Sequence, residues 1–308
     1  MKKDCLSLKD LGKKDILSAI DLASEIKSKI NNKEDYKPLK DVILGMIFEK
    51  SSTRTRLSFE AGMKRLGGDA IFLSSRDIQL GRGESIEDSA RVISGFVDII
   101  MIRTFEHTRI LDFAKHSSVP VINALTSLLH PCQVLADLMT IKEHYGSLEN
   151  LKIAFFGDGN NMANSWLYAA SILGLNLSIA SPVDLSVDGI VVQDALKEAT
   201  KTGANIVLTD NPNEAAKNAD VIYTDVWASM GEEEQTAKKH SMLRNYQVNK
   251  ELADKAKSDY IFMHCLPAHR GEEVTADVID GTHSIVWEEA KNRTFVQMAV
   301  IMKLLGRN

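Results

Sequence analysis

The chain has 308 residues, of which 44% are hydrophobic and 26% are charged, and its formal net charge is −5. This composition is that of a folded protein with a large core, and the length favours about two domains over one. The net negative charge, without a clustered tract of lysine and arginine, argues against nucleic acid or an anionic membrane as the main partner.

Three cysteines, Cys5, Cys132 and Cys265, are scattered along the chain. An odd and widely spaced set fits a reducing compartment better than a disulfide framework, so we expect a cytoplasmic protein. No apolar segment follows the two lysines near the N-terminus, and no secretory signal is expected. The longest uncharged stretch, 159–183, is interrupted by asparagine, serine and glycine, and we expect a buried helix and strand there rather than a membrane span.

The chain begins with a predicted amphipathic helix over 16–30, where isoleucine and alanine recur at helical spacing. Short apolar runs then alternate with segments of helical pattern. The expected strands are 42–48, 70–73, 97–102 and 119–123, and the expected helices are 56–66, 85–94 and 108–116. Strands that alternate with helices predict a parallel sheet.

A helix over 131–145, with a proline at its start, is predicted to connect this sheet to a second one. The second series of strands is expected at 151–156, 175–180, 204–209, 221–226 and 260–263, and the last segment, 287–305, is helical in pattern. The predicted fold class is α/β, with two similar-sized domains, each a parallel sheet flanked by helices. The active site is expected in the cleft between the domains, beyond the carboxyl ends of the strands.

The most informative feature is Ser52-Thr53-Arg54-Thr55-Arg56, which follows the first apolar run and opens a helix. The N–H groups and the dipole at a helix start favour an anion. Two arginines there oppose the dipole unless an anion neutralises them, and guanidinium groups match the geometry of phosphate oxygens. The pattern predicts a phosphate site, against the alternative of a capped helix with exposed arginines.

Further polar loops follow the other predicted strands, where ligands of parallel sheets bind. They are Arg103-Thr104-Phe105, His130-Pro131-Cys132-Gln133, Gly157-Asp158-Gly159-Asn160-Asn161, Asp225 with Ser229-Met230-Gly231, and His264-Cys265-Leu266-Pro267. Since these loops carry a thiol, an imidazole and a carboxylate, they favour chemistry over binding alone. A non-enzymatic binding protein with a two-domain cleft remains an alternative.

Two other classes fit parts of these loops. A nicotinamide dehydrogenase would explain Gly157-Asp158-Gly159 after a strand, but Met162 stands at the third glycine position and no acidic residue ends the next strand. A metal site would use His130 with Cys132, or His264 with Cys265. Neither pair has the spacing of a zinc site, so no metal is expected.

In order and spacing, these motifs resemble the ornithine carbamoyltransferases of the aspartate/ornithine carbamoyltransferase family, over essentially the whole chain. The Ser-Met-Gly loop and the His-Cys-Leu-Pro turn distinguish them from the aspartate enzymes. The resemblance implies transfer of the carbamoyl group of carbamoyl phosphate to the δ-amine of L-ornithine, giving L-citrulline and phosphate, in arginine biosynthesis. It implies no cofactor.

The resemblance also implies which residues act. Carbamoyl phosphate would be bound by Ser52, Thr53, Arg54, Thr55, Gln79, Arg103, His130, Pro131, Cys132, Gln133, Cys265, Leu266 and Arg293. Ornithine would be bound by Asn161, Asp225, Ser229 and Met230, and the catalytic residues would be Arg54, Arg103, His130, Asp225 and Cys265. The residues alone leave open whether Cys265, Asp225 or the departing phosphate takes the proton of the amine.

The implied domains are a carbamoyl phosphate-binding domain over 1–145 and an ornithine-binding domain over 146–286. The C-terminal helix 287–308 would pack back on the first domain. Gln79 matches a residue that reaches the phosphate site of a neighbouring subunit, which implies a homotrimer with shared active sites. From its glycines and charges alone, the loop that carries Gln79 would be a solvated turn.

Overall fold

The computed structural model describes residues 2–74, 83–227 and 236–307, and the chain folds as two compact units. The first unit is Met1–Met139 with Lys291–Asn308, and the second is Thr140–Ala290. Both divisions fall inside continuous helices, α5 (Pro131–Tyr145) and α12 (Val286–Leu304). The domain limits expected from the sequence lie instead at the end of α5 and the start of α12.

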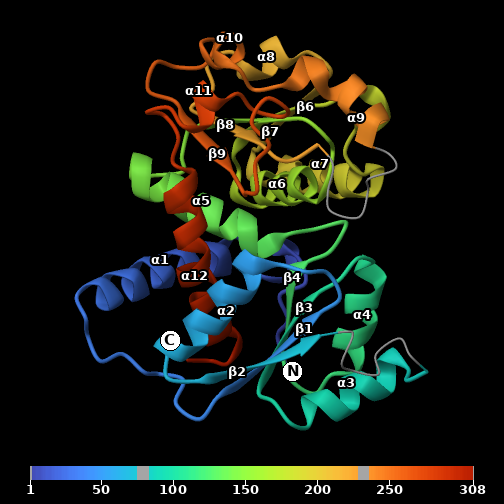
Figure 1. Cartoon of the computed structure of the whole chain (residues 1–308), viewed down its shortest axis with the longest axis vertical. Helices are drawn as coiled ribbons and strands as arrows, with labels where there is room; N and C mark the ends of the chain where they lie inside the picture. The colour runs from blue at the N-terminus through green and yellow to red at the C-terminus, as the bar shows by residue number, and fades with distance from the viewer. Residues whose placement is uncertain (1, 75–82, 228–235, 308) are drawn as a thin grey trace. The chain divides into compact units, whose positions relative to one another are not determined.

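The first unit contains a four-stranded parallel sheet with the order β2-β1-β3-β4 (Figure 1). Its strands are β1 (Ile43–Phe48), β2 (Asp69–Ser74), β3 (Ile99–Arg103) and β4 (Val121–Leu125), and its helices are α1 (Gly12–Asn31), α2 (Thr53–Arg65), α3 (Ile86–Ser94) and α4 (His107–His116), with a 3-10 turn at Leu8–Asp10. Each predicted strand and helix is present, with ends shifted by a few residues. The predicted parallel sheet is therefore confirmed.

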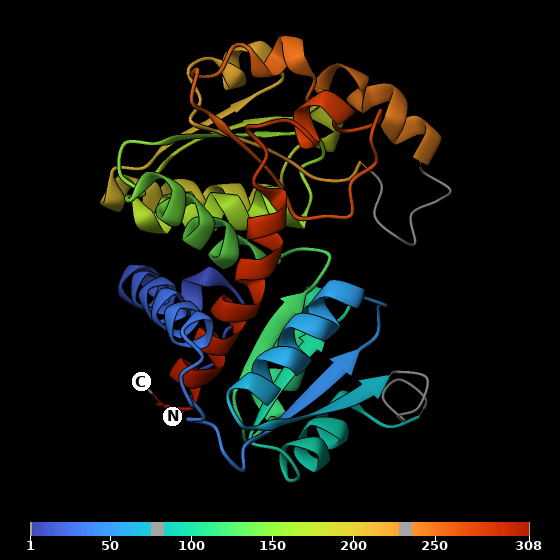
Figure 2. The same cartoon turned by 60° about the vertical axis from the view of Figure 1, so that its left-hand side comes forward.

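The side chains of this sheet alternate between two helical layers. On one face Ile47, Ile100 and Ile102 pack with Ala90 of α3 and Phe113 of α4. The other face is covered by α2, and a Cβ on Gly62 of α2 would lie 3.0 Å from Met298 of α12. The chain enters the sheet at β1, an inner strand, and moves first to β2 on one side and then to β3 and β4 on the other. Right-handed crossovers in these two directions place α2 on one face of the sheet and α3 and α4 on the other (Figure 2).

The helix α12 returns to the start of the chain. The Nζ of Lys27 in α1 donates to Asn292 Oδ1 at 2.9 Å, and the Nζ of Lys303 donates to the hydroxyl of Ser18 at 2.6 Å. In both cartoon views α1 lies beside α12 (Figures 1 and 2). This packing fixes the position of Arg293, which lies between the two contacts along α12.

The second unit contains a five-stranded parallel sheet with the order β7-β6-β5-β8-β9. Its strands are β5 (Lys152–Phe156), β6 (Asn176–Ala180), β7 (Asn205–Thr209), β8 (Val221–Thr224) and β9 (Ile261–His264). Its helices are α6 (Asn161–Leu173), α7 (Gly189–Thr202), α8 (Pro212–Ala216), α9 (Thr236–Leu243), α10 (Lys250–Ala253) and α11 (Ala276–Ile279), with 3-10 turns at Val183–Leu185 and Arg244–Tyr246. The sequence prediction of these strands is confirmed as well.

The second sheet is also covered on both faces. Ala154, Phe156 and Ile222 pack towards α8, α10 and α11, whereas Phe155 stacks on Tyr223, and Trp166 of α6 meets Tyr223 edge-on. Figure 1 shows α6 and α7 on one side of the sheet and α8 and α10 on the other. Within the described part of the chain, every helix is too short or too polar to span a bilayer.

The reversal of strand order places a switch point in each sheet. It lies between β1 and β3 in the first unit and between β5 and β8 in the second. At such a point the connections that follow two adjacent strands go to opposite faces of the sheet. Their loops therefore diverge and leave a crevice for a ligand. The loops at these two points carry the Ser-Thr-Arg-Thr-Arg segment with Arg103, and Asn160 with Asp225.

Gly159 belongs to the Gly-x-Gly segment that suggested a dinucleotide site. The fold shows a different reason why glycine is needed at this position. A Cβ at this position would lie 2.3 Å from both Ser186 C and Val187 N, which are backbone atoms. The Gly159 N–H donates to Leu185 O at 2.7 Å. Glycine is required because two chain segments approach closely there, whether or not a ligand binds.

We expect Gly159→Ala to lower the free energy of unfolding by about 3 kcal/mol or more, because backbone cannot move aside as a flexible side chain can. Gly189→Ala is the matched control, since among the described residues outside its own stretch of α7 no atom lies within 4 Å of its Cβ position. That change should stay within about 0.5 kcal/mol of the parent. Urea unfolding measures both, and equal effects would contradict the close approach.

Candidate active site

The first half of the site is the start of α2. Ser52 is the N-cap, with extended backbone, and its Oγ accepts from the backbone N–H of Thr55 at 3.2 Å. The cap starts α2 at Thr53, three residues before the predicted start, so Arg54 and Thr55 lie in the first turn. No acidic residue lies in that turn. The helix start therefore combines N–H donors with arginine side chains and no carboxylate, an arrangement that favours an anion.

Two arginines distant in sequence meet at the hydroxyl of Thr55. Thr55 Oγ1 accepts from Nη2 of Arg293 at 2.8 Å and from Nη1 of Arg103 at 3.3 Å. Thr55 is fully buried, and Arg103 and Arg293 are only 8% and 3% exposed. Two guanidinium groups thus converge at the start of α2, from the end of β3 and from α12. Their combined charge favours an oxyanion or a phosphate oxygen at this point.

His130 adds a neutral imidazole to this positive site. It is 4% exposed. Its burial, together with the positive charges of Arg293 and Arg103, holds the pKa of His130 well below its ordinary value. The ring therefore stays uncharged at neutral pH and can donate a hydrogen bond to a carbonyl oxygen without adding charge.

The remaining predicted residues of this loop begin α5, where Pro131 is the first helical residue. The Cys132 thiol donates to Asn123 O at 3.5 Å, and its burial raises the pKa of the thiol to about 12. The side chain of Cys132 is therefore an unreactive part of the core. The amide nitrogen of Gln133 donates to Asp137 Oδ1 at 2.8 Å, and both residues are fully buried.

A pocket of about 800 Å³ opens beside the start of α2, with Ser52, Thr53 and Arg56 in its wall. Arg56 was expected to support the phosphate site. Its guanidinium group lies 3.9 Å from the ring centroid of Phe72, and its Nε lies 3.3 Å from Glu60 Oε2. These contacts direct Arg56 along the wall of the pocket.

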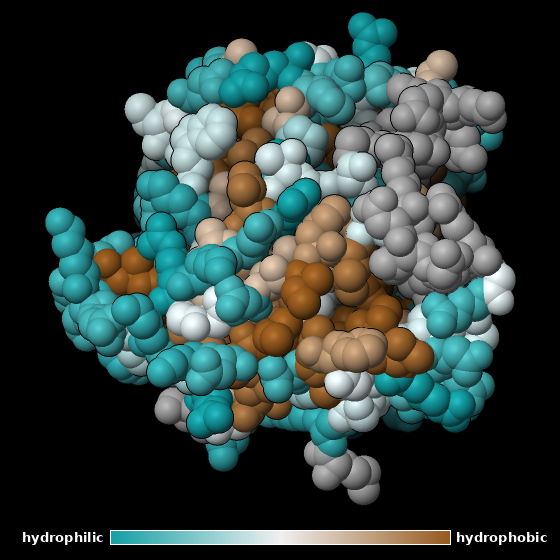
Figure 3. Space-filling model, turned by 60° about the horizontal axis from the view of Figure 1, so that its bottom comes forward, coloured by the Kyte–Doolittle hydropathy of each residue, from teal (hydrophilic) through white to brown (hydrophobic). Residues whose placement is uncertain are grey.

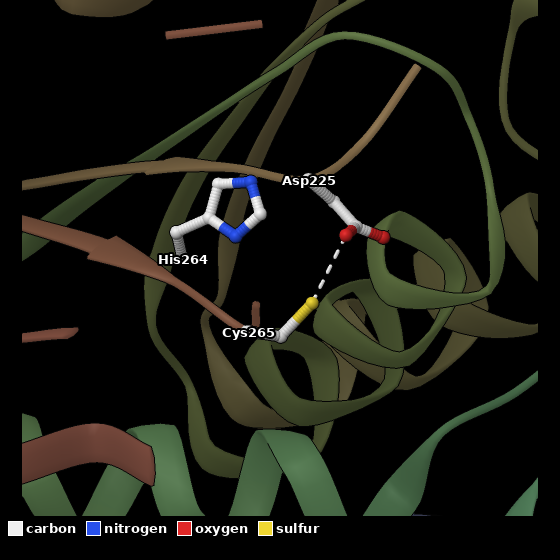
Figure 4. Close-up of side chains that lie close together, drawn as sticks. All are labelled: Asp225, His264 and Cys265. Atoms are coloured by element: carbon white, nitrogen blue, oxygen red, sulfur yellow. Dashed lines mark hydrogen bonds between the residues drawn. The ribbon is translucent and has the colours of Figure 1, made fainter. Parts of the chain in front are cut away.

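The second half of the site centres on Asp225, which follows β8 and is 8% exposed. Its Oδ2 accepts from the amide of Asn160 at 2.8 Å, and its Oδ1 accepts from the Cys265 thiol at 3.0 Å and from the N–H of Val226 at 2.8 Å. Figure 4 shows Asp225 and Cys265 directed towards each other, with His264 beside them. Three donors thus fix this carboxylate after β8, next to the loop that follows β5.

Asp225, His264 and Cys265 place one ligand atom each within 4.8 Å of one another, which raises the question of a metal ion. Both ring nitrogens of His264 are already engaged. The N–H of Leu266 donates to Nδ1 at 2.9 Å, and Nε2 lies 3.2 Å from Glu273 Oε1. His264 therefore shapes the turn rather than serving as a ligand.

Leu266 also takes a left-handed backbone conformation, with φ of 57°. This conformation is unfavourable for a leucine and is typical of turns that present a functional group. The hydrogen bond from its N–H to His264 helps to hold it. The turn therefore keeps Cys265 and Leu266 in a defined orientation at the end of β9.

The predicted site residues fall into two groups. Thr55, Arg103 and Arg293 form one, electrostatically coupled to His130, and Asp225 and Cys265 form the other. Asn161 is the first residue of α6, whereas Gln79, Ser229 and Met230 lie outside the described residues. Sequence reasoning missed two residues, Asn160 and Asp137. Asn160 was adjacent to a predicted residue, and Asp137 lies four positions after Gln133 on one helix face, which could have identified it.

We expect His130 to make stability depend on pH below about 6.5. The unfolded chain gains a proton on this histidine as the pH falls, while the folded chain does not, so folded stability is lost. Between pH 7.5 and 5.5 the parent should therefore lose about 1.4 kcal/mol more stability than His130→Gln. Urea unfolding at both pH values measures the difference, and the shifted pKa of His107 cancels because both proteins contain it. Equal pH dependence of the two proteins would contradict a neutral His130.

Known proteins match this chain over nearly its whole length. Residues 3–143 match "Aspartate/ornithine carbamoyltransferase, carbamoyl-P binding domain", and residues 149–304 match "Aspartate/ornithine carbamoyltransferase, Asp/Orn binding domain". A curated ornithine carbamoyltransferase of Anoxybacillus flavithermus is 52% identical over 303 residues, which are 98% of this chain and 96% of that protein.

Solved structures agree. The ornithine carbamoyltransferase of Pyrococcus furiosus superposes with a TM-score of 0.96 at 46% identity, covering 99% of this chain and 97% of the other. The anabolic ornithine carbamoyltransferase of Campylobacter jejuni gives a TM-score of 0.93 at 45% identity, covering 99% and 100%. With both of its units matched and the fold shared throughout, the chain belongs to the aspartate/ornithine carbamoyltransferase family.

Proposed function

We propose that this protein transfers the carbamoyl group of carbamoyl phosphate to the δ-amine of L-ornithine, which makes it a carbamoyltransferase. The observation that carries the proposal is the convergence of Arg103 and Arg293 on Thr55 Oγ1 at the start of α2. A buried pair of guanidinium groups beside a helix start suits a substrate with both a phosphate and a carbonyl oxygen. Curated relatives named ornithine carbamoyltransferase, at 52% identity, support the acceptor.

Carbamoyl phosphate is proposed to bind with its phosphate on the N–H groups and side chains of Ser52, Thr53, Arg54 and Thr55. Its carbonyl oxygen would accept from Arg103, His130 and Arg293. Cys132 and Pro131 would contribute only backbone, since the Cys132 thiol is directed to Asn123. Leu266 and Cys265 are proposed to border the carbamoyl group.

Gln133 is proposed to recognise the carbamoyl NH₂ group. Asp137 accepts the hydrogen bond from Gln133 Nε2, and a carboxylate can only accept. This contact assigns the amide orientation, so Gln133 Oε1 is the atom that would accept from a substrate NH₂ group.

Ornithine is proposed to bind through Asn161, Asp225, Ser229 and Met230. Asp225 is a fixed carboxylate, because Asn160, Cys265 and a backbone N–H hold it. It would attract the α-ammonium group. The turn with Cys265 and Leu266 would lie beside the δ-amine.

The reaction follows from these charges. The lone pair of the neutral δ-amine attacks the carbamoyl carbon, the carbonyl oxygen becomes an oxyanion, and the C–O bond to phosphate breaks. The amine loses one proton, and citrulline and phosphate leave. Each well-placed donor to the oxyanion contributes about 3–4 kcal/mol. Because Cys265 donates its S–H to Asp225, and Asp225 is assigned to the α-ammonium group, we favour the departing phosphate as the proton acceptor.

The working assembly is proposed to be a homotrimer with shared active sites, in which Gln79 of one subunit reaches the phosphate site of another. The pocket of about 800 Å³ beside α2 exceeds what carbamoyl phosphate alone requires, which leaves room for a neighbouring chain. Figure 3 displays a face of the molecule on which apolar residues gather. Large exposed apolar side chains of the first unit are Leu57, Ile71, Val92, Phe96, Phe105 and Leu111. Such surfaces are typical of subunit contacts.

The metabolic role is proposed to be arginine biosynthesis in the cytoplasm. One structural relative is described as anabolic. All three cysteines are free thiols, as expected in a reducing compartment.

We expect the purified protein to form a carbamoylated product from carbamoyl phosphate with ornithine, and not with aspartate, putrescine or acetylornithine. No metal or nucleotide should be needed. Colorimetric detection of citrulline, and phosphate release for every acceptor, measure this. Turnover of another acceptor would overturn the ornithine assignment but keep the phosphate site. No turnover with any acceptor would favour a binding protein instead.

We expect Arg54→Ala to lower kcat/KM by about 100-fold or more, because the start of α2 loses its phosphate donor. Arg65→Ala is the matched control, since Arg65 is exposed in the last turn of the same helix. It should retain full activity. Both proteins should unfold at the parent urea concentration, and an active Arg54→Ala protein would contradict the phosphate site.

A further inference from the structure

A histidine and two glutamates gather in the second unit, outside the residues used by the proposed reaction. His269, Glu272 and Glu273 come from the turn after β9, and His240 of α9 contacts one of them. One ligand atom from each of His269, Glu272 and Glu273 lies within 4.8 Å of the other two. His240 Nε2 lies 3.3 Å from Glu272 Oε2.

The separation of His269 and Glu272 fits a shared cation better than a direct hydrogen bond, and Glu273 lies slightly farther from His269. His269 Nδ1 lies 3.6 Å from Glu272 Oε2 and 4.0 Å from Glu273 Oε2. Both distances exceed those of N–H···O hydrogen bonds, about 2.7–3.2 Å. A tetrahedral zinc ion with nitrogen and oxygen ligands at about 2.0–2.2 Å holds those ligands about 3.3–3.6 Å from one another.

Glu273 provides a second, independent observation. It is fully buried, and its Oε1 accepts from the N–H of His269 at 2.6 Å and lies 3.2 Å from His264 Nε2. Its Oε2 is also buried and has no hydrogen-bond partner among the described residues. That oxygen faces His269 Nδ1. A buried carboxylate oxygen directed at a histidine, beyond hydrogen-bond distance, is what a metal site requires of a ligand.

The surroundings hold Glu273 in one orientation through hydrogen bonds from the His269 N–H and the His264 ring. Since the N–H of Leu266 donates to His264 Nδ1, the proton of that ring is on Nε2, which donates to Glu273. A histidine that supports a carboxylate ligand in this way orients it and limits its freedom.

The turn itself presents the three residues together. The N–H of Glu272 donates to His269 O at 2.9 Å, and the N–H of Gly271 donates to Val274 O at 2.8 Å. Gly271 has φ of 91°, a conformation that glycine adopts readily. His269 and Glu272 remain partly exposed, so an ion can reach them from solvent.

We propose that His269, Glu272 and Glu273, with a water molecule as the fourth ligand, bind a divalent transition-metal ion, with Zn²⁺ as the best match. Imidazole and carboxylate ligands suit zinc, nickel and copper better than calcium or magnesium. The ion is not part of the carbamoyl transfer. It would stabilise the turn that carries Cys265, because Glu273 connects the ligand set to His264.

The test is calorimetric titration of ZnCl₂ into tag-free full-length protein carrying Cys265→Ser, which removes the one thiol that is not buried. We expect one bound Zn²⁺ per chain. His269→Ala or Glu272→Gln, each added to that protein, should weaken binding by at least about tenfold. Glu251→Gln, an exposed glutamate of α10, is the matched control and should leave affinity unchanged.

Three results would overturn the proposal: no zinc binding by the Cys265→Ser protein, binding unaffected by both His269→Ala and Glu272→Gln, or equal weakening by Glu251→Gln. A second readout is the urea midpoint, which zinc should raise in the Cys265→Ser protein and raise clearly less in the His269→Ala and Glu272→Gln proteins. Midpoints measured without zinc show whether each variant folds like its parent. Since neither readout uses turnover, they are independent of the proposed reaction.

Discussion

In the first unit, two buried guanidinium groups converge on one threonine hydroxyl, and the other features of the site depend on this contact. Arg103 and Arg293 carry like charges, yet both donate to Thr55 Oγ1. Burying two cations side by side is costly, and an anion at the adjacent helix start would relieve that cost. The same charges and burial keep His130 neutral. The proposed phosphate affinity, the proposed oxyanion stabilisation and the protonation state of the imidazole thus have one electrostatic origin.

Topology explains why the polar residues are found where they are. In each sheet the strand order reverses between two neighbours, β1 and β3 or β5 and β8. Thr55 and Arg103 follow the first pair, and Asn160 and Asp225 follow the second. In both units a hydrogen bond joins the residues from the two loops. Both faces of each sheet are apolar and are covered by helices. Polar side chains therefore meet at the ends of the strands.

The turn after β9 shows how local structure and chemistry are combined. His264 is buried within a network in which Leu266, Glu273 and Glu289 each contact it. This network holds Leu266 in a left-handed conformation and directs Cys265 to Asp225.

Gly159 is another residue whose role is set by local packing. Its place in a Gly-x-Gly segment suggested a nucleotide, but its role is to let residues 186–187 approach the loop after β5.

The sequence by itself determined the α/β class and the parallel sheets, and it predicted a phosphate site at the start of α2, because periodicity, caps and loop composition are local properties. It also identified Asp225 and Cys265 as residues of one motif set. Only the tertiary structure decided that Arg293 meets Thr55 across more than 200 residues, that Asp137 orients Gln133, and that the Cys132 thiol points into the core. The physical reason is that such contacts depend on how helices pack on the sheets, and burial, which sets the pKa of His130 and Cys132, exists only in the packed chain.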